Sequence, residues 1–165
     1  MLDPQPGDQV LEVGGGPGAA AELICARLTT GRLLEVDRSA MAVERTLQRN
    51  AEAVAAGRLS VVQTALADVA LQPSSVDRAL TVDVNLFWVG DPAVELTVLR
   101  RGLRPGGVLL VAYGAGGPTA ADRVAPRVTA ALLAAGFEDA QLLTGDAGFA
   151  IRATVPRRIR ETPGT

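Results

Sequence analysis

The sequence predicts an α/β fold in which a mostly parallel sheet is doubly wound, with helices on both of its faces. Short β-rich apolar runs alternate with longer helix-like stretches along most of the chain, and this alternation is typical of a parallel sheet. The last two apolar runs are instead joined by the short turn Gly145-Asp146-Ala147-Gly148. That turn indicates an antiparallel hairpin at the C-terminal end of the sheet.

Seven segments carry the aliphatic and β-branched residues that favour strands, and turn residues bound them. In chain order the predicted strands are residues 9–13, 32–36, 59–64, 76–82, 108–113, 140–144 and 149–155. Asp37 follows the second strand directly. The first five strands are separated by longer segments, as parallel neighbours require.

Four segments read as helices. They are residues 19–28, 39–56, 92–101 and 119–135. Ser39 is the expected N-cap of the second helix, and Gly57 is expected to end it. The third helix is expected to have Asp91 as N-cap and Pro92 at its first helical position. The glycine turn after Pro105 then leads into the strand at 108–113, and Gly136 ends the fourth helix.

The chain has 165 residues, of which 48% are hydrophobic and 21% charged, and these values suit one globular core. Residues 1–155 are expected to form a single domain. Residues 156–165 are polar and rich in Arg, and they are expected to be a mobile tail.

Composition argues against several classes of function. The net charge of −2 and the absence of a basic face do not favour nucleic-acid binding. No apolar run reaches the length of a membrane span, and the first residues carry no signal-peptide pattern. Cys25 is the only thiol and there is no His, so neither a metal site nor a disulfide is expected. A reducing, cytoplasmic setting fits this composition.

A glycine-rich turn follows the first strand, at Gly14, Gly16 and Gly18. Such a turn lets a ligand approach the backbone and leads into a helix N-terminus. The spacing Gly14-x-Gly16-x-x-Ala19 also fits a dinucleotide fingerprint. Glu12 favours a different ligand, because a carboxylate just before the glycines suits an ammonium group and suits a pyrophosphate poorly.

Asp37 stands at the end of the second strand, 23 residues after Gly14. In an open parallel sheet, an acid at this position can accept hydrogen bonds from both hydroxyls of a ribose. The alternative is an acid that only caps the helix after it, in the turn Asp37-Arg38-Ser39.

Together with two later segments, these features closely resemble the class I S-adenosylmethionine-dependent methyltransferases, in particular their small-molecule, type 11-like branch. The segments that carry the resemblance are 12–18, 34–39, 82–88 and 103–111, and the resemblance covers residues 6–155. It implies a Rossmann-like fold of seven strands, mostly parallel with a C-terminal antiparallel hairpin. It also implies S-adenosylmethionine as cofactor and in-line methyl transfer to a small-molecule acceptor.

The resemblance implies roles around the first two strands. The turn glycines Gly14, Gly16 and Gly18 would line the methionine and ribose part of the cofactor. Glu12 would attract its ammonium group, directly or through water, and Asp37 would hold the ribose diol.

Further cofactor contacts are implied beyond these. Arg38 and Met41 would lie near the adenine, although Met41 equally suits plain helix packing. The family often has an Asp after the third strand; Ala65 stands there, so Asp68 is the candidate, with a solvated loop acid as the alternative. Asp83 would lie near the methionine end, where the methyl group leaves.

The transfer needs positioning and exclusion of water more than it needs a strong base. Because His and Lys are absent, the candidate bases are Asp83, Glu35 and Tyr113. Glu35 stands where the family usually has a small residue. Asn85 could orient the acceptor by hydrogen bonds.

Two adjacent aromatic residues, Phe87 and Trp88, follow the fourth strand. They either wall the acceptor pocket or pack under the next helix. The loop 114–118 flanks the same region, either as a lid or as a simple turn.

Only about eight residues precede the first strand, whereas many members of the resembled family carry further N-terminal helices over the cofactor. The chain is therefore a core fragment, or has an open site, or is covered by a second copy in a homodimer or by a partner chain. The alternatives to a methyltransferase are a non-catalytic protein of the same fold and a nicotinamide-dependent reductase. Glu12 and the terminal hairpin argue against the reductase.

Overall fold

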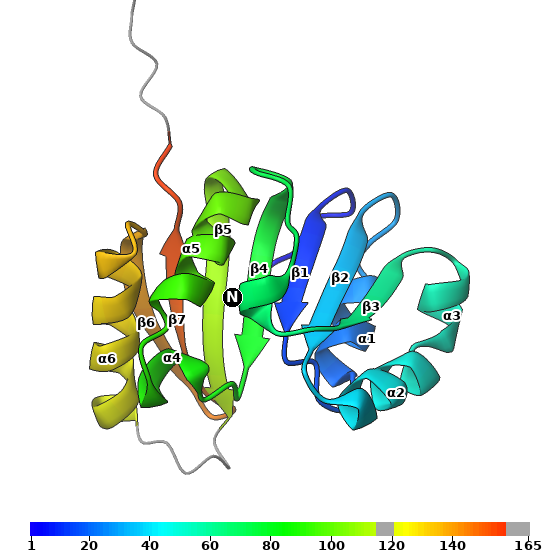
Figure 1. Ribbon diagram of the computed structural model, residues 1–165, viewed down its shortest axis with the longest axis horizontal. Helices are drawn as coiled ribbons and strands as arrows, with labels where there is room; N and C mark the ends of the chain where they lie inside the picture. The colour runs from blue at the N-terminus through cyan, green and yellow to red at the C-terminus, as the bar shows by residue number, and fades with distance from the viewer. Residues whose placement is uncertain (115–120, 158–165) are drawn as a thin grey trace, which may run out of the picture.

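The sheet is the centre of the molecule. In the computed structural model, which describes residues 1–114 and 121–157, seven strands form one sheet in the order β3-β2-β1-β4-β5-β7-β6 (Figure 1). The strands are β1 (Gln9–Val13), β2 (Arg32–Asp37), β3 (Leu59–Gln63), β4 (Val76–Val82), β5 (Leu103–Gly114), β6 (Glu138–Gly145) and β7 (Gly148–Thr154). The first five pair in parallel, and β7 runs antiparallel to both β5 and β6. The predicted fold class is confirmed.

Helices cover both faces of the sheet. They are α1 (Ala19–Cys25), α2 (Ala40–Arg49), α3 (Ala51–Ala55), α4 (Leu86–Val89), α5 (Ala93–Gly102) and α6 (Ala121–Ala134), with a 3₁₀ turn η1 at Leu66–Asp68. Because side chains alternate along a strand, each face has its own core. Val10 and Leu33 pack with α1 and α3 in one core, whereas Leu11 and Leu109 pack with α5 and α6 in the other.

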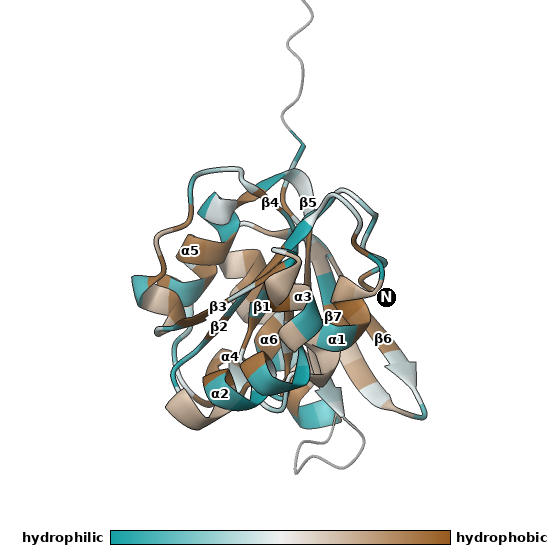
Figure 2. Cartoon of the chain, turned by 90° about the vertical axis from the view of Figure 1, so that its right-hand side faces the viewer, coloured by the Kyte–Doolittle hydropathy of each residue, from teal (hydrophilic) through white to brown (hydrophobic). Residues whose placement is uncertain are grey.

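The two cores give the protein a three-layer section. Figure 2 shows hydrophobic residues concentrated on the central strands, while α2 carries hydrophilic segments toward the surface. None of the helices in the described ranges is long and apolar enough to cross a membrane.

One predicted helix is in fact two. The segment predicted as a helix over 39–56 begins as expected, because the Ser39 hydroxyl accepts a hydrogen bond from Ala42 N at 3.3 Å. It then breaks at Asn50, which separates α2 from α3. The Asn50 side chain donates to Gly18 O at 3.0 Å and to Thr46 O at 3.1 Å. An Asn side chain that bonds to backbone oxygens competes with the helical hydrogen bonds, which explains the break.

The starts of two other elements also differ from the prediction. Helix α5 begins at Ala93, with Pro92 in the N-cap position, and Asp91 Oδ1 accepts a hydrogen bond from Ala93 N at 3.0 Å. The glycine turn after Pro105 is not a connection between elements but a bulge inside the long strand β5. There Val76 of β4 pairs with Leu103, but Arg78, two residues later, pairs with Val108, so β5 carries extra residues between the two pairs. Gly106, with φ +78°, permits that bulge.

The C-terminal hairpin is confirmed. Strands β6 and β7 pair antiparallel, with Gly145 opposite Gly148 across the turn. Strand β6 is longer than predicted, whereas β7 has the predicted length and begins and ends one residue earlier. Helix α6 is described from Ala121. Residues 115–120, which include most of the expected loop, and the tail from 158 onward lie outside the described residues.

Candidate functional site

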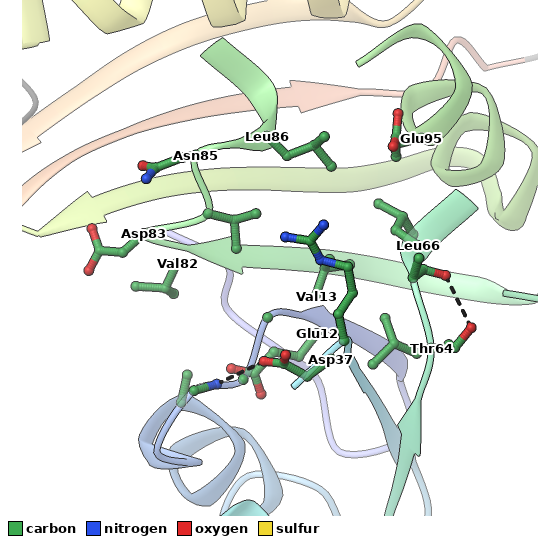
Figure 3. A pocket seen from close by; sticks show the side chains of 18 of the residues that line it. Glu12, Val13, Asp37, Thr64, Leu66, Val82, Asp83, Asn85, Leu86 and Glu95 are labelled. Atoms are coloured by element: carbon green, nitrogen blue, oxygen red, sulfur yellow. Dashed lines mark hydrogen bonds between the residues drawn. The ribbon is translucent and has the colours of Figure 1, made fainter. Parts of the chain in front are cut away.

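A cleft of about 870 Å³ opens at the carboxyl ends of β1, β2 and β4 (Figure 3). The strand order reverses between β1 and β4, and open α/β sheets bind ligands at such a point. The lining residues are Glu12, Val13, Gly14, Gly15, Gly16, Pro17, Ala19, Ala20, Val36, Asp37, Arg38, Thr64, Ala65, Leu66, Val82, Asp83, Val84, Asn85, Leu86, Val89, Gly90 and Glu95. The cleft therefore joins the turns that follow β1, β2, β3 and β4.

The glycine turn forms one wall of the cleft, but only some of its glycines face the cleft, while Gly18 faces α2. Gly16 lines the cleft with φ +55°, and a Cβ atom added there would meet no heavy atom within 4 Å. Its missing side chain thus leaves the space open to a ligand. Gly18 does not line the cleft. A Cβ atom there would come within 2.8 Å of Asn50 Nδ2 and 2.9 Å of Thr46 Cα, so this glycine lets α1 pack closely against α2.

Glu12 is buried at the floor of the cleft. Its side chain is 1% exposed, and its Oε2 atom finds no hydrogen-bond partner among the described residues. Burial raises the pKa of Glu12 to about 8, and the nearby carboxylates Glu35 and Asp37 add to the rise. A buried carboxyl with a free acceptor oxygen at a cleft is suited to a cationic group.

Glu35 lies next to Glu12 on the neighbouring strand. It is fully buried, with both carboxylate oxygens unpartnered within the described part of the chain. Burial raises the pKa of Glu35 to about 7; the nearby Thr46 hydroxyl partly offsets this rise, and Asp37 adds to it. A Cβ atom at Gly15 would collide with the Glu35 carboxylate. Gly15, the second residue of the glycine turn, therefore leaves free the space that the Glu35 carboxylate occupies.

Asp37 connects the turns after β1 and β2. Its Oδ1 atom accepts a hydrogen bond from Ser39 N at 2.8 Å, and its Oδ2 atom accepts one from Gly16 N at 3.4 Å. The side chain is half-buried and lines the cleft. Asp37 therefore helps to shape the turn before α2 and also lines the cleft. Its binding of a ribose stays a prediction. Arg38, beside it, is exposed and lines the cleft too.

The turn after β4 brings Asp83 and Asn85 to the opposite side of the cleft (Figure 3). Asp83 has φ +55°, which is unusual for a residue other than glycine. It is held there because Asp83 N donates to Ala112 O at 2.9 Å and Asp83 Oδ1 accepts from Gly114 N at 2.8 Å. Asn85 precedes α4 and is exposed.

Tyr113 lies behind this turn and does not line the cleft. It is 2% exposed, its hydroxyl donates to Val84 O at 3.2 Å, and its ring stacks on Phe149 with centroids 5.2 Å apart. Burial raises the pKa of Tyr113 well above its ordinary value, and Asp83 adds to the rise. A tyrosine that is buried and already bonded supports the turn after β4 and is poorly placed to take a proton from a ligand.

Several other candidates also lie outside the cleft lining. Met41 is 58% exposed on α2, and Asp68 is exposed in η1. Phe87 is buried in the core beneath α5 and α6, and Trp88 packs against the same core. Of the two expectations for these aromatic residues, packing under a helix is therefore the one that the structure shows.

Thr64, Leu66 and Glu95 are among the cleft residues that the sequence analysis did not name as candidates. Glu95 is in the first turn of α5, a position where an acid is common because of the helix dipole. The sequence held no signal that would bring this helix to the cleft. Leu66 and Thr64 follow β3, and their place at the carboxyl end of that strand was a usable signal.

The chain matches known proteins in sequence. A family model described as a methyltransferase domain matches residues 10–107. A 37.1 kDa protein in a transposon of Streptomyces fradiae is 35% identical over 114 residues, which cover 67% of this chain and 31% of that protein. Trans-aconitate 2-methyltransferase from Paracidovorax citrulli is 31% identical over 102 residues, covering 62% of this chain and 37% of the enzyme. The chain thus spans about a third of the length of these relatives.

Solved structures share the fold at low sequence identity. A SAM-dependent methyltransferase from Aquifex aeolicus superposes with a TM-score of 0.78 and 18% identity, over 94% of this chain and 85% of that one. A SAM-dependent O-methyltransferase from Thermotoga maritima superposes with a TM-score of 0.77 and 16% identity, over 98% and 64% of the two chains.

Proposed function

Because the chain belongs to the methyltransferase-domain family, we propose that it binds S-adenosylmethionine in the cleft and transfers the methyl group to a small-molecule acceptor. The observation that carries the proposal is the buried Glu12 carboxyl, whose unpartnered oxygen lies at the floor of a glycine-walled cleft. S-adenosylmethionine has an ammonium group and a sulfonium, and a carboxylate-lined site favours such cations.

The shape of the cleft supports the same ligand. Its volume of about 870 Å³ falls within the usual range for cofactor sites. The empty space beside Gly16 allows a ligand to lie against the backbone of the turn. The residues present therefore fit the cofactor in both charge and size.

Asp37 is proposed to bind the ribose hydroxyls. Each of its oxygens already accepts one backbone hydrogen bond, but a carboxylate oxygen has two acceptor sites. The two existing bonds fix the orientation of the carboxylate, so the remaining acceptor sites are aimed before the ligand arrives. Arg38, on the same rim, is proposed to lie near the adenine.

The chemistry requires alignment more than it requires a base. When bound, the cofactor supplies an electrophilic methyl group on its sulfonium. The protein holds the acceptor in line, and Asp83 and Asn85 are proposed to orient it from the turn after β4. If the acceptor loses a proton, Asp83 is the proposed group to accept it at a carboxylate oxygen, since Tyr113 is buried away from the cleft.

A small acceptor is supported by the relative trans-aconitate 2-methyltransferase, which matches over 62% of this chain. The test is transfer of isotope-labelled methyl from S-adenosylmethionine to a panel of small carboxylic acids, phenols and amines. Labelled product that disappears in Asp83→Asn is expected, with Asp146→Asn, in the exposed turn between β6 and β7, as the matched control. A chain that binds the cofactor but methylates nothing on the panel would favour the non-catalytic alternative.

A further inference from the structure

Two glutamates face each other across the first two strands of the sheet. Glu12 of β1 is in register with Glu35 of β2 in a parallel pair, so their side chains leave the sheet on the same face. Like charges directly opposite on neighbouring strands repel each other. The arrangement is therefore costly if both carboxyls are ionised.

Burial makes that cost larger. Glu12 is 1% exposed and Glu35 is 0% exposed. Three of their four carboxyl oxygens, Glu12 Oε2 and both oxygens of Glu35, are buried and unpartnered within residues 1–114 and 121–157. Two unpartnered carboxylates in an apolar setting are far less stable than one carboxylate and one neutral carboxyl. The pKa values of about 8 for Glu12 and about 7 for Glu35 agree with this reasoning.

The groups around the two glutamates do little to offset their negative charge. Asp37 adds a third negative charge from the end of β2. The Thr46 hydroxyl of α2 lowers the pKa of Glu35 by less than burial raises it. Cys25 of α1 is a thiol whose pKa is raised to about 11 by burial, so it stays neutral. Arg58, before β3, is the cationic group that acts on Cys25, but it is not among the causes that shift the pKa of either glutamate.

The pair is joined to the cleft through two contacts. Glu12 lines the cleft directly, whereas Glu35 does not. The Glu35 carboxylate instead fills the space where Gly15 would carry a side chain, so it lies directly under the glycine turn. Glu35 can therefore affect a ligand only through Glu12 and through that turn, which makes it a positioning residue.

We propose that Glu12 and Glu35 form an electrostatically coupled carboxyl pair that retains a proton at neutral pH, and that a cationic ligand entering the cleft displaces this proton to solvent. The identity of that ligand as S-adenosylmethionine rests on the proposed function. With one proton, the two carboxyls together carry one negative charge. The ligand brings a positive group to Glu12, and the pair then releases its proton to solvent and carries two negative charges. No bond other than O–H is broken.

This coupling predicts that affinity depends on pH. Between about pH 7 and about pH 8, where the free pair holds one proton and the bound pair holds none, each pH unit strengthens binding by about tenfold. The dependence should level off above about pH 8, where the free pair has already lost its proton. A purely structural role for Glu35 would instead change affinity by the same factor at every pH.

The test is calorimetric titration of the chain with S-adenosylhomocysteine from about pH 6 to about pH 8.5, in buffers that differ in ionisation enthalpy, so that protons released are counted. The variants are Glu35→Gln and, as a matched control, Glu52→Gln on the exposed surface of α3. The ligand's own ammonium titrates equally in all three proteins. We expect the wild type and the control to release up to one proton near pH 7, and Glu35→Gln to release clearly less, with its rise in affinity moved to lower pH.

Two failures can be told apart. Binding with the same proton count and the same pH profile in Glu35→Gln would overturn the carboxyl pair and leave the proposed function in place. No binding by the wild type at any pH would overturn both. Titration of the glutamate carboxyl carbons by NMR in the ligand-free protein gives an independent measurement. Two carboxyls that both titrate near the ordinary pKa of 4.5 would also overturn the pair.

Discussion

The backbone N–H of Gly16 points at Asp37 Oδ2, with the two atoms 3.4 Å apart. This contact joins the turn after β1 to the end of β2, and it fixes the carboxylate that is proposed to hold the ribose. The two strands were expected to bring these residues together from their positions alone, because both turns lie at the carboxyl edge of the sheet.

Replacing Asp37 with Asn is therefore expected to weaken binding of S-adenosylhomocysteine by about 10- to 100-fold, because bonds to a charged acceptor contribute about 1.5–3 kcal/mol. Calorimetry at neutral pH measures the change. Asp146→Asn, an exposed acid in the turn between β6 and β7 and outside the cleft lining, is the control and should bind as the wild type does. Equal affinities in all three proteins would remove Asp37 from the binding site.

Tyr113→Phe is expected to lower stability and to leave methyl transfer nearly intact. The hydroxyl donates to Val84 O at 3.2 Å, and its loss leaves a partly buried carbonyl without this donor, which costs about 1–2 kcal/mol. Denaturant unfolding measures the first effect and a transfer assay the second. A fall in turnover of about 100-fold or more with a folded protein would show that Tyr113 acts as a general base after all.

The buried glutamates should make the ligand-free protein less stable as pH rises. Their pKa values in the folded protein, about 8 and about 7, lie above the ordinary value of 4.5. A raised value in the folded state means that the stabilising contribution is fully present below the ordinary value and is lost as pH rises through the folded values. The free energy of unfolding is thus predicted to fall between about pH 5 and about pH 8.5.

The variant Glu35→Gln isolates this effect. It removes a buried charge but keeps the shape of the side chain, so at about pH 8.5 it is expected to be more stable than the wild type by about 1–3 kcal/mol. The difference should shrink toward about pH 5. Urea unfolding of both proteins and of Glu52→Gln checks this, and a Glu35→Gln protein that is less stable than the wild type at high pH contradicts it.

The glycines of the turn offer a separate test of packing. Gly18→Ala would place a Cβ atom 2.9 Å from Thr46 Cα, at a backbone φ of +74°. It is expected to lower the free energy of unfolding by about 1–3 kcal/mol. Gly145→Ala is the control, since a Cβ atom there meets nothing within 4 Å, and it should change stability little. Similar stabilities for both variants would mean that α1 and α2 are packed less tightly than the structure shows.

The fold was predictable because its signals are local. The alternation of apolar strands with helices, the Ser39 cap and the turn between Gly145 and Gly148 each follow from residues near one another in the chain. The break at Asn50 was not predictable, because it depends on a hydrogen bond from Asn50 to Gly18 across 32 residues. The bulge at Gly106 similarly needs the partner strand β4 to define it.

The cleft was predictable at the strand ends and not elsewhere. Glu12, Asp37 and Asp83 follow from the rule that ligands bind at the carboxyl edge, and all three line the cleft. Gly18 and Tyr113 matched the expected pattern in sequence, but Gly18 lies against Asn50 and the Tyr113 hydroxyl bonds to Val84 O, so neither lines the cleft. Glu95 reaches the cleft only because α5 packs near η1, which no local pattern reveals.

The most direct test of the central claim is calorimetric titration of S-adenosylhomocysteine into the wild type and into Gly16→Ala. A methyl group at Gly16 would occupy the open space of the cleft without touching the rest of the protein, although φ +55° adds some backbone strain. Circular dichroism therefore first confirms that the variant is folded. Micromolar binding by the wild type, on the order of −8 kcal/mol, and its loss in folded Gly16→Ala are predicted. Equal binding by both proteins, or none by the wild type, would contradict the proposal that this cleft binds the cofactor.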